Sequence, residues 1–170
     1  YSQWTRNVKI RNQAESIQYG LLKARNEALR RNKVVTFWLV SSSTPNQLGA
    51  DCATSHTGNN WVISLRDPQA KCHLAVSEDT DPLILDKHAA ADGASQTTIS
   101  TQPAGAYAIS FNGLGQVSVR TESGTPLTRI DITANNSNDN DRAYQIQLNA
   151  GGMTRLCDPQ VSDSNDPRKC

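Results

Sequence analysis

The stretch Leu21–Asn32, LLKARNEALRRN, passes through Lys33 directly into Val34–Val40, VVTFWLV. The first part is rich in Ala, Leu, Lys, Arg and Glu, which favour an α-helix. The second is a β-branched and aromatic run, typical of a buried strand. Cations in the last helical turn complement the helix dipole, and Asn32 suits a left-handed C-terminal cap. The junction therefore predicts a helix that leads without a linker into a sheet.

The helix extends towards the N-terminus, because apolar residues recur there at alternating spacings of four and three. We predict a helix over residues 5–31, with Leu22 and Leu29 widening its apolar face. The first four residues carry no helix start signal, so we expect the helix to continue upstream of Tyr1. The predicted packing face consists of Ile10, Ala14, Ile17, Leu21, Ala24 and Ala28. The opposite, solvated face carries Arg11, Glu15, Gln18, Lys23, Arg25 and Arg30.

Short strands and polar turns follow the helix. The clearest hairpin signal is Tyr107–Phe111 and Gln116–Arg120 around Asn112-Gly-Leu-Gly115. We also predict strands at 34–40, 61–66, 73–77, 82–86, 96–100, 128–133, 143–148 and 153–156, and a polar loop at 41–60. Because the helix stripe needs cover, we expect one α+β domain, 1–170, with the helix packed on antiparallel sheets. It comprises the helix (1–33), a β-rich body (34–156) and a C-terminal tail (157–170).

The four cysteines are Cys52, Cys72, Cys157 and Cys170, widely spaced and without a Cys-x-x-Cys pair. Their even number indicates two structural disulfides formed in an oxidising compartment. Three pairings are possible, and we favour Cys52–Cys72 with Cys157–Cys170, because neighbours close short loops. The second loop would contribute on the order of 2–3 kcal/mol to stability. Zinc binding that recruits His56 and His73 is the alternative, and irregular ligand spacing disfavours it.

The charge is unevenly distributed along the chain. The formal net charge is +1, yet residues 1–33 hold eight Lys or Arg residues against two Glu residues. The rest of the chain is correspondingly acidic, so the two parts would present different surfaces to a partner. No stretch approaches the roughly 20 apolar residues that span a bilayer. Bulk charge therefore favours neither a nucleic-acid partner nor an acidic substrate.

No catalytic signature is present. The sequence has no Gly-x-Ser-x-Gly elbow, phosphate-binding glycine loop or His-Glu-x-x-His helix. His56, His73 and His88 fall in polar, loop-like segments. The run 135–141, NNSNDND, offers oxygen ligands, but it lacks the central glycine and closing glutamate of a calcium loop. We therefore predict no enzymatic activity, no cofactor and no metal, and a flexible polar loop at 135–141.

Leu21–Arg31 resembles the pattern L-x-x-A-R-x-E-A-x-x-R of the FimT/FimU minor pilins and the related GspH pseudopilins. Residues 61–63 resemble the family's W-x-V strand, and residues 109–115 its F-x-x-x-G hairpin. Residues 144–157 resemble its final hairpin and the cysteine that follows. The resemblance covers nearly the whole chain and is nearer to FimU than to FimT.

The resemblance implies a filament subunit that carries a hydrophobic half-helix ahead of Tyr1. That half-helix would anchor the subunit in the inner membrane of a Gram-negative bacterium, with a periplasmic domain, before it joins a pilus at the cell surface. Partners would be other minor pilins and major pilin subunits, contacted through the helix and the globular body. In this interpretation the apolar stripe binds partner helices at its membrane-proximal end, and residues 135–141 and the tail are contact surfaces. The expected role is in a priming or tip complex of a type IV pilus.

Two alternatives follow from the same resemblance. One is a GspH-like pseudopilin of type II secretion. The other is a DNA-binding minor pilin for natural transformation, since FimT-type pilins carry a G-R-x-R motif near the last hairpin. In this sequence only Arg155 of that motif survives. A Cys157–Cys170 loop would bring Arg168 and Lys169 towards it, but Asp158, Asp163 and Asp166 offset these cations. DNA binding therefore ranks second.

Overall fold

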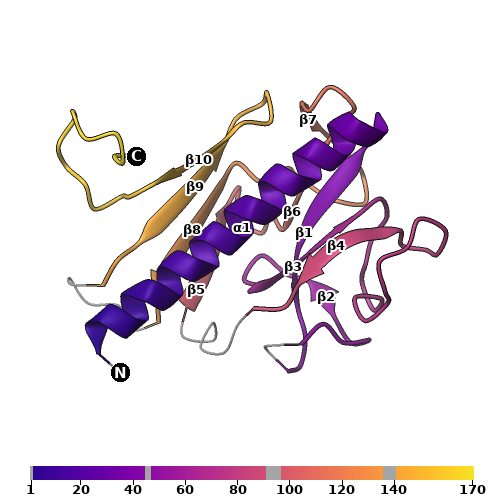
Figure 1. Ribbon diagram of the computed structural model, residues 1–170, viewed down its shortest axis with the longest axis horizontal. Helices are drawn as coiled ribbons and strands as arrows, with labels where there is room; N and C mark the ends of the chain where they lie inside the picture. Colours follow the sequence, from indigo (N-terminus) through magenta and orange to yellow (C-terminus); the bar gives the residue numbers. More distant parts are fainter. Residues whose placement is uncertain (1, 45–46, 91–96, 136–140) are drawn as a thin grey trace.

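The computed structural model describes residues 2–44, 47–90, 97–135 and 141–170. A single long helix, α1 (Gln3–Arg31), runs diagonally in front of two antiparallel sheets (Figure 1). The fold class is the one that the sequence predicts, a long N-terminal helix packed on antiparallel sheets.

Both ends of α1 are capped by side-chain or backbone hydrogen bonds. The Ser2 side chain accepts a hydrogen bond from the Thr5 N–H at 3.3 Å, which is an N-cap interaction. The expectation that this end lacks a start signal is therefore wrong. At the other end Asn32 adopts the left-handed conformation, with φ 51°, and its N–H donates to the Ala28 carbonyl. Asn32 is thus the predicted C-terminal cap.

The larger sheet has six strands in the order β4-β3-β1-β6-β7, with β2 beside β1. The smaller sheet has four strands in the order β10-β9-β8-β5. The strands of the larger sheet are β1 (Val35–Ser41), β2 (Ala53–Thr54), β3 (Asn60–Ser64), β4 (Ile84–His88), β6 (Ala108–Phe111) and β7 (Val117–Ser118). Those of the smaller sheet are β5 (Thr97–Gln102), β8 (Arg129–Ala134), β9 (Tyr144–Leu148) and β10 (Thr154–Cys157).

Most predicted strands lie within one or two residues of their expected bounds, and three expectations need correction. Residues 73–77 form no strand, because the chain turns after Cys72, with the Leu74 N–H bonded to the Lys71 carbonyl. The predicted loop 41–60 contains β2. The predicted strand Gln116–Arg120 shortens to β7, where the Val117 N–H bonds the Ala150 carbonyl of the neighbouring hairpin.

The main core lies between α1 and both sheets. All six residues of the predicted packing face are at most 1% exposed, and they pack with inward side chains of both sheets, such as Phe37 and Ile146. Leu22 and Leu29, in contrast, are 43% and 41% exposed. Each follows a stripe residue by one position, which rotates it about 100° around the helix. The prediction that they widen the buried stripe is therefore wrong.

The far face of the larger sheet carries a second, smaller core. Trp38 and Val40 point into it and pack against the Cys52–Cys72 disulfide. Phe37 and Leu39 point the other way, towards α1. Because both faces of β1 are covered, this strand is a continuous apolar run rather than an alternating one.

Gly20 lets α1 approach the larger sheet closely. A Cβ atom there would lie 2.7 Å from Cε2 of Phe37 and 2.9 Å from Cε2 of Trp61, which is closer than real Cβ contacts. These aromatic rings are fully buried and form part of the core, so neither can move without a cost.

We predict that Gly20→Ala destabilises the fold. Overpacking costs about 1–3 kcal/mol, which exceeds the gain of about 1 kcal/mol from replacing glycine in a helix. Urea denaturation should show a lower midpoint for this variant. The matched control is Asn12→Ala on the exposed face of α1, which should be neutral or slightly stabilising. A Gly20→Ala variant as stable as the parent would contradict the close approach.

Candidate functional site

Arg25 joins the helix to the tips of two hairpins. Its Nε donates a hydrogen bond to the Gly115 carbonyl at 2.9 Å. Gly115 lies in the β6–β7 turn and Gly152 in the β9–β10 turn, and both have positive φ angles of 78° and 86°. A Cβ atom on Gly152 would lie 2.0 Å from the Gly115 oxygen and 3.0 Å from Nε of Arg25. Arg25 is therefore part of an interior contact rather than of the solvated face predicted for it.

Glu27 and Arg31, one turn further on, form a second link to the body. The Glu27 carboxylate accepts from Arg31 Nε and from Arg30 Nη2, both at 2.7 Å. Burial raises the pKa of Glu27, but the hydrogen bonds from Arg31 and Arg30 outweigh it and hold the pKa below 4.5. Arg31 also reaches Glu78 at 2.5 Å, which fastens residues 76–81 to the end of the helix. Every residue of the resembling helix motif thus has a structural contact: Leu21, Ala24 and Ala28 in the core, and Arg25, Glu27 and Arg31 with polar partners.

The two disulfides are Cys52–Cys72 and Cys157–Cys170, which is the predicted pairing. The second closes the tail onto β10, and the Asp158 N–H bonds the Arg168 carbonyl at 2.6 Å. Arg155 donates from Nη2 to the carbonyl oxygens of Pro167 and Lys169. The predicted cationic residue Arg155, in β10, is therefore brought next to the tail loop that carries Arg168 and Lys169.

These three cations are engaged by the tail itself. Two nitrogens of Arg168, Nε and Nη2, donate to Asp166 at 3.1 and 2.6 Å. The side-chain hydrogen bond from Arg168 lowers the pKa of Asp166 to about 2. Lys169 Nζ lies 3.4 Å from the Ser162 carbonyl. The arrangement is that of a folded loop, with its arginines used to hold its own backbone and carboxylates.

The histidines and the polar run differ in part from the prediction. His56 and His73 lie in turns, as expected, but His88 is in β4 and stacks on Trp61 with ring centroids 5.6 Å apart. Residues 136–140 of the run 135–141 lie outside the described residues. Asp141 is 3% exposed and forms an ion pair with Arg6 at 3.0 Å. In the described part of the chain no group of three His, Cys, Asp or Glu residues could hold a metal ion.

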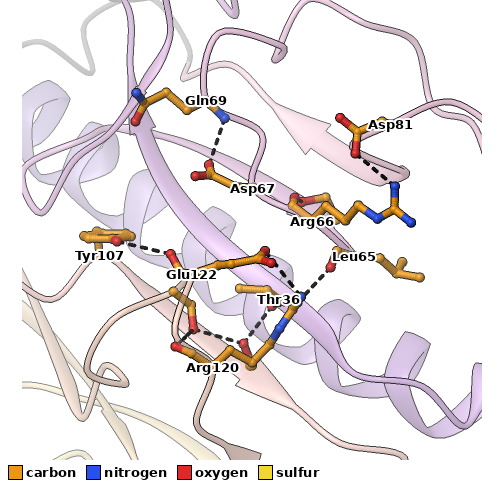
Figure 2. Close-up of polar contacts among 12 residues, drawn as sticks. Thr36, Leu65, Arg66, Asp67, Gln69, Asp81, Tyr107, Arg120 and Glu122 are labelled. Carbon is orange, nitrogen blue, oxygen red and sulfur yellow. Dashed lines mark hydrogen bonds and ion pairs between the residues drawn. The ribbon is translucent and has the colours of Figure 1, made fainter.

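A ring of hydroxyl groups lies beside Arg120 on the larger sheet (Figure 2). Thr36 and Ser110, from β1 and β6, share a hydrogen bond of 2.7 Å, and Ser110 in turn contacts Ser123. Arg120 Nη1 donates to the Thr36 hydroxyl and to the Leu65 carbonyl, while its own carbonyl accepts from Ser123. The ring satisfies buried hydroxyls and fastens residues 120–124 to the sheet. Its chemistry is structural, since the arginine is a donor and cannot act as a general base.

One flank of α1 carries exposed apolar side chains. Trp4, Leu22 and Leu29 are spaced by close to whole helical turns, so they lie along one side of the helix. Trp4 is 75% exposed. Ile10 and Ala14, at the N-terminal end of the predicted packing face, are instead buried in the chain's own core. The stripe is therefore used within the subunit along its whole length, whereas the side chains of this flank are exposed.

Among the described residues, no helix is both long and apolar enough to cross a membrane.

Comparison with known proteins agrees with this architecture. The sequence model of the family described as Type II transport protein GspH matches residues 13–152, most of the chain. The chain belongs to the GspH family, whose members are structural pilins and pseudopilins that assemble with other pilins and are anchored in a membrane. None of the curated proteins compared matches the chain.

Two crystal structures of the type IV minor pilin FimU of Pseudomonas aeruginosa, strain PAO1, share the fold. One aligns with a TM-score of 0.54 and covers 94% of this chain and 99% of FimU. The other has a TM-score of 0.50, with coverages of 90% and 99%. The sequence identity is 13% in both, so the similarity concerns the fold.

We predict that Arg25→Ala loosens both hairpin tips. The Gly115 carbonyl loses a charged hydrogen-bond donor, which should lower the free energy of unfolding by about 1.5–3 kcal/mol. Hydrogen exchange of the Val117 amide, which bonds to Ala150, should become faster. Arg30→Ala is the matched control, since its side chain is 65% exposed and should contribute at most about 0.5 kcal/mol. Equal effects of the two substitutions would contradict the role of Arg25 in holding the hairpin tips to the helix.

Proposed function

We propose that this chain is a structural minor pilin that takes part in the initiation or tip complex of a type IV pilus. The observation that carries the proposal is the division of α1 into two sides. One side closes the subunit's own core, and the flank with Trp4, Leu22 and Leu29 presents apolar surface outwards. Apolar side chains in line on a helix suit packing against another helix. In such a subunit the same helix, α1, packs on its own sheets with one side and contacts neighbouring subunits with the other.

The proposal includes a location and a chemical role. The subunit is anchored in the inner membrane of a Gram-negative bacterium with its body in the periplasm, and it then enters the pilus. Two disulfides fit the oxidising periplasm. Its contribution is packing rather than catalysis. If the helix flank of one subunit packs against a different surface of the next, the contact repeats head to tail and builds an open filament instead of a closed ring.

DNA binding for transformation remains the second candidate, because the disulfide-closed tail brings Arg168 and Lys169 near Arg155. The hydrogen bonds that these cations already make within the tail make DNA binding the weaker candidate. Arg155 already donates to two tail carbonyls, and Arg168 already holds Asp166. Phosphate binding depends on the number of cations that neutralise the backbone. The third candidate is a GspH-like pseudopilin of type II secretion, which would use the same flank of α1 with different partners.

A pull-down between this protein and purified soluble domains of other subunits tests the role. We expect it to retain type IV minor pilins and not type II pseudopilins from the same genome. The variant Leu22→Asp with Leu29→Asp should weaken retention at least tenfold, because charges replace apolar contacts at the interface. Gln18→Asp, a polar position on the same helix, is the control for added charge. Retention of pseudopilins alone would favour the secretion role.

A gel shift with double-stranded DNA at two salt concentrations tests the second candidate. We expect no binding in the micromolar range at physiological salt. Salt-sensitive binding that is lost in Arg155→Ala would replace the structural role with DNA capture.

A further inference from the structure

A groove of about 540 Å³ lies between the first half of α1 and the C-terminal part of the smaller sheet. Its volume falls in the range of about 300–1,000 Å³ that is typical of ligand sites. One wall is α1, with Trp4, Val8 and Arg11. The other wall is formed by β9, β10 and the disulfide-closed tail. We call this cavity the tail groove.

The floor of the tail groove is apolar. Leu156 of β10 pairs with Ile146 of β9, so both side chains point towards the helix side of the sheet. Ile146 is fully buried beneath α1, whereas Leu156 is only partly buried and lines the groove. Tyr144, two residues before Ile146, lines it too. The smaller sheet is thus wider than the helix that covers it, and the uncovered strip becomes the floor.

Three arginines surround this floor: Arg11 from α1, Arg142 from the segment just before β9, and Arg168 from the tail. Arg11 uses Nε for Glu15 at 2.9 Å, and Arg142 uses Nη1 for Asp158 at 3.1 Å. Within the described ranges, the terminal nitrogens of Arg11 and the Nε of Arg142 have no acceptor. A guanidinium group with an unused edge matches a carboxylate, which can accept two parallel hydrogen bonds.

The carboxylates of the groove decide which anion fits. Glu15 and Asp158 line the same space as the arginines, so the lining carries three positive and two negative charges. A nucleic acid has a charge on every phosphate and would meet both carboxylates. A protein segment can place one acidic side chain at the arginines and an apolar one on the floor. The mixed lining therefore favours a peptide over a polyanion.

We propose that the tail groove receives an extended segment of a partner subunit that carries one acidic side chain. Its carboxylate lies between Arg11 and Arg142, and a neighbouring aromatic or aliphatic side chain packs on Tyr144, Leu156 and Trp4. The site rests on the proposed function, because it presumes that the chain assembles with other subunits. It adds a second contact, which shares Trp4 with the apolar flank but does not include Leu22 or Leu29.

The probe is a blocked peptide, Gly-Ser-Gln-Leu-Asp-Phe-Gln-Gly, titrated into the isotope-labelled protein and followed by NMR. We expect saturable shifts of the Trp4 indole N–H and of the Tyr144 and Leu156 amides. A peptide with Asn in place of Asp should bind at least tenfold more weakly, because it lacks the carboxylate. No shifts in the groove, or equal shifts with both peptides, would overturn the proposal.

Two exposed positions provide variants that leave the fold intact. Trp4→Ala and Arg11→Gln should each reduce peptide affinity several-fold, and the double variant by about tenfold or more. The matched controls are Leu22→Ala and Arg30→Gln, an apolar and a cationic position on α1 outside the groove. An equal loss in the controls would assign the effect to the helix in general and reject the groove.

Two further measurements separate this site from the proposed function. If partner subunits bind the parent protein and the Arg11→Gln variant equally well, the groove proposal fails while the structural role stands. If the peptide binds in the groove but no pilus subunit is retained, the role in the pilus fails and the peptide site stands. A short double-stranded oligonucleotide that shifts the same resonances more tightly than the peptide would overturn the choice of a protein ligand.

Discussion

The packing of one helix against two sheets constrains the rest of this molecule. Ala14, Ala24 and Ala28 are fully buried, and Gly20 sits where a side chain would strike Phe37 and Trp61. Small residues at these positions bring the helix axis close to both sheets, which lets Ile17 and Leu21 fill the space between them. Among the described residues, backbone hydrogen bonds join the two sheet regions from Leu127 N–H to Ala108 at 3.0 Å and from Val117 N–H to Ala150 at 3.1 Å. The shared helix, which packs on both sheets, is therefore a main link between them.

The polar counterpart of this packing is the contact of Arg25 with two glycine turns. Gly115 and Gly152 have conformations that favour glycine, and their turns touch each other as well as the guanidinium group. The helix motif and the glycine hairpins are more than 80 residues apart in the chain, yet they meet at one point. This contact explains why an arginine belongs in a stretch that otherwise looks like an ordinary amphipathic helix.

The fold class could be predicted from the sequence because periodicity reports burial directly. The stripe from Ile10 to Ala28 has the period of a helix with one buried side, and the run Val34–Val40 has the composition of a strand buried on both faces. The pairing of neighbouring cysteines is also the one in the structure. Helical position alone assigns Arg25 to solvent, because it cannot reveal a hairpin that folds back over the helix. Periodicity cannot predict the tail groove either, because the groove exists only where β10 extends beyond the helix that covers the smaller sheet. Gly115 and Gly152 are the signal in the sequence, because glycine permits both a positive φ and a close approach to another part of the chain.

The structure shows that the uneven charge of the sequence is largely used in ion pairs within the subunit. The basic helix and the acidic body suggest two surfaces for partners, but the ion pairs Arg6–Asp141, Lys23–Asp86 and Arg31–Glu78 join helix to body. Arg11 and Arg30 pair within the helix, with Glu15 and Glu27. Much of the positive charge therefore stabilises the helix on its own subunit and is not displayed as a continuous basic face. A polyanion would have to compete with these carboxylates, whereas a neighbouring subunit of the kind proposed above would meet an apolar flank that carries none of these ion pairs. The electrostatics thus point in the same direction as the packing, towards contact with protein.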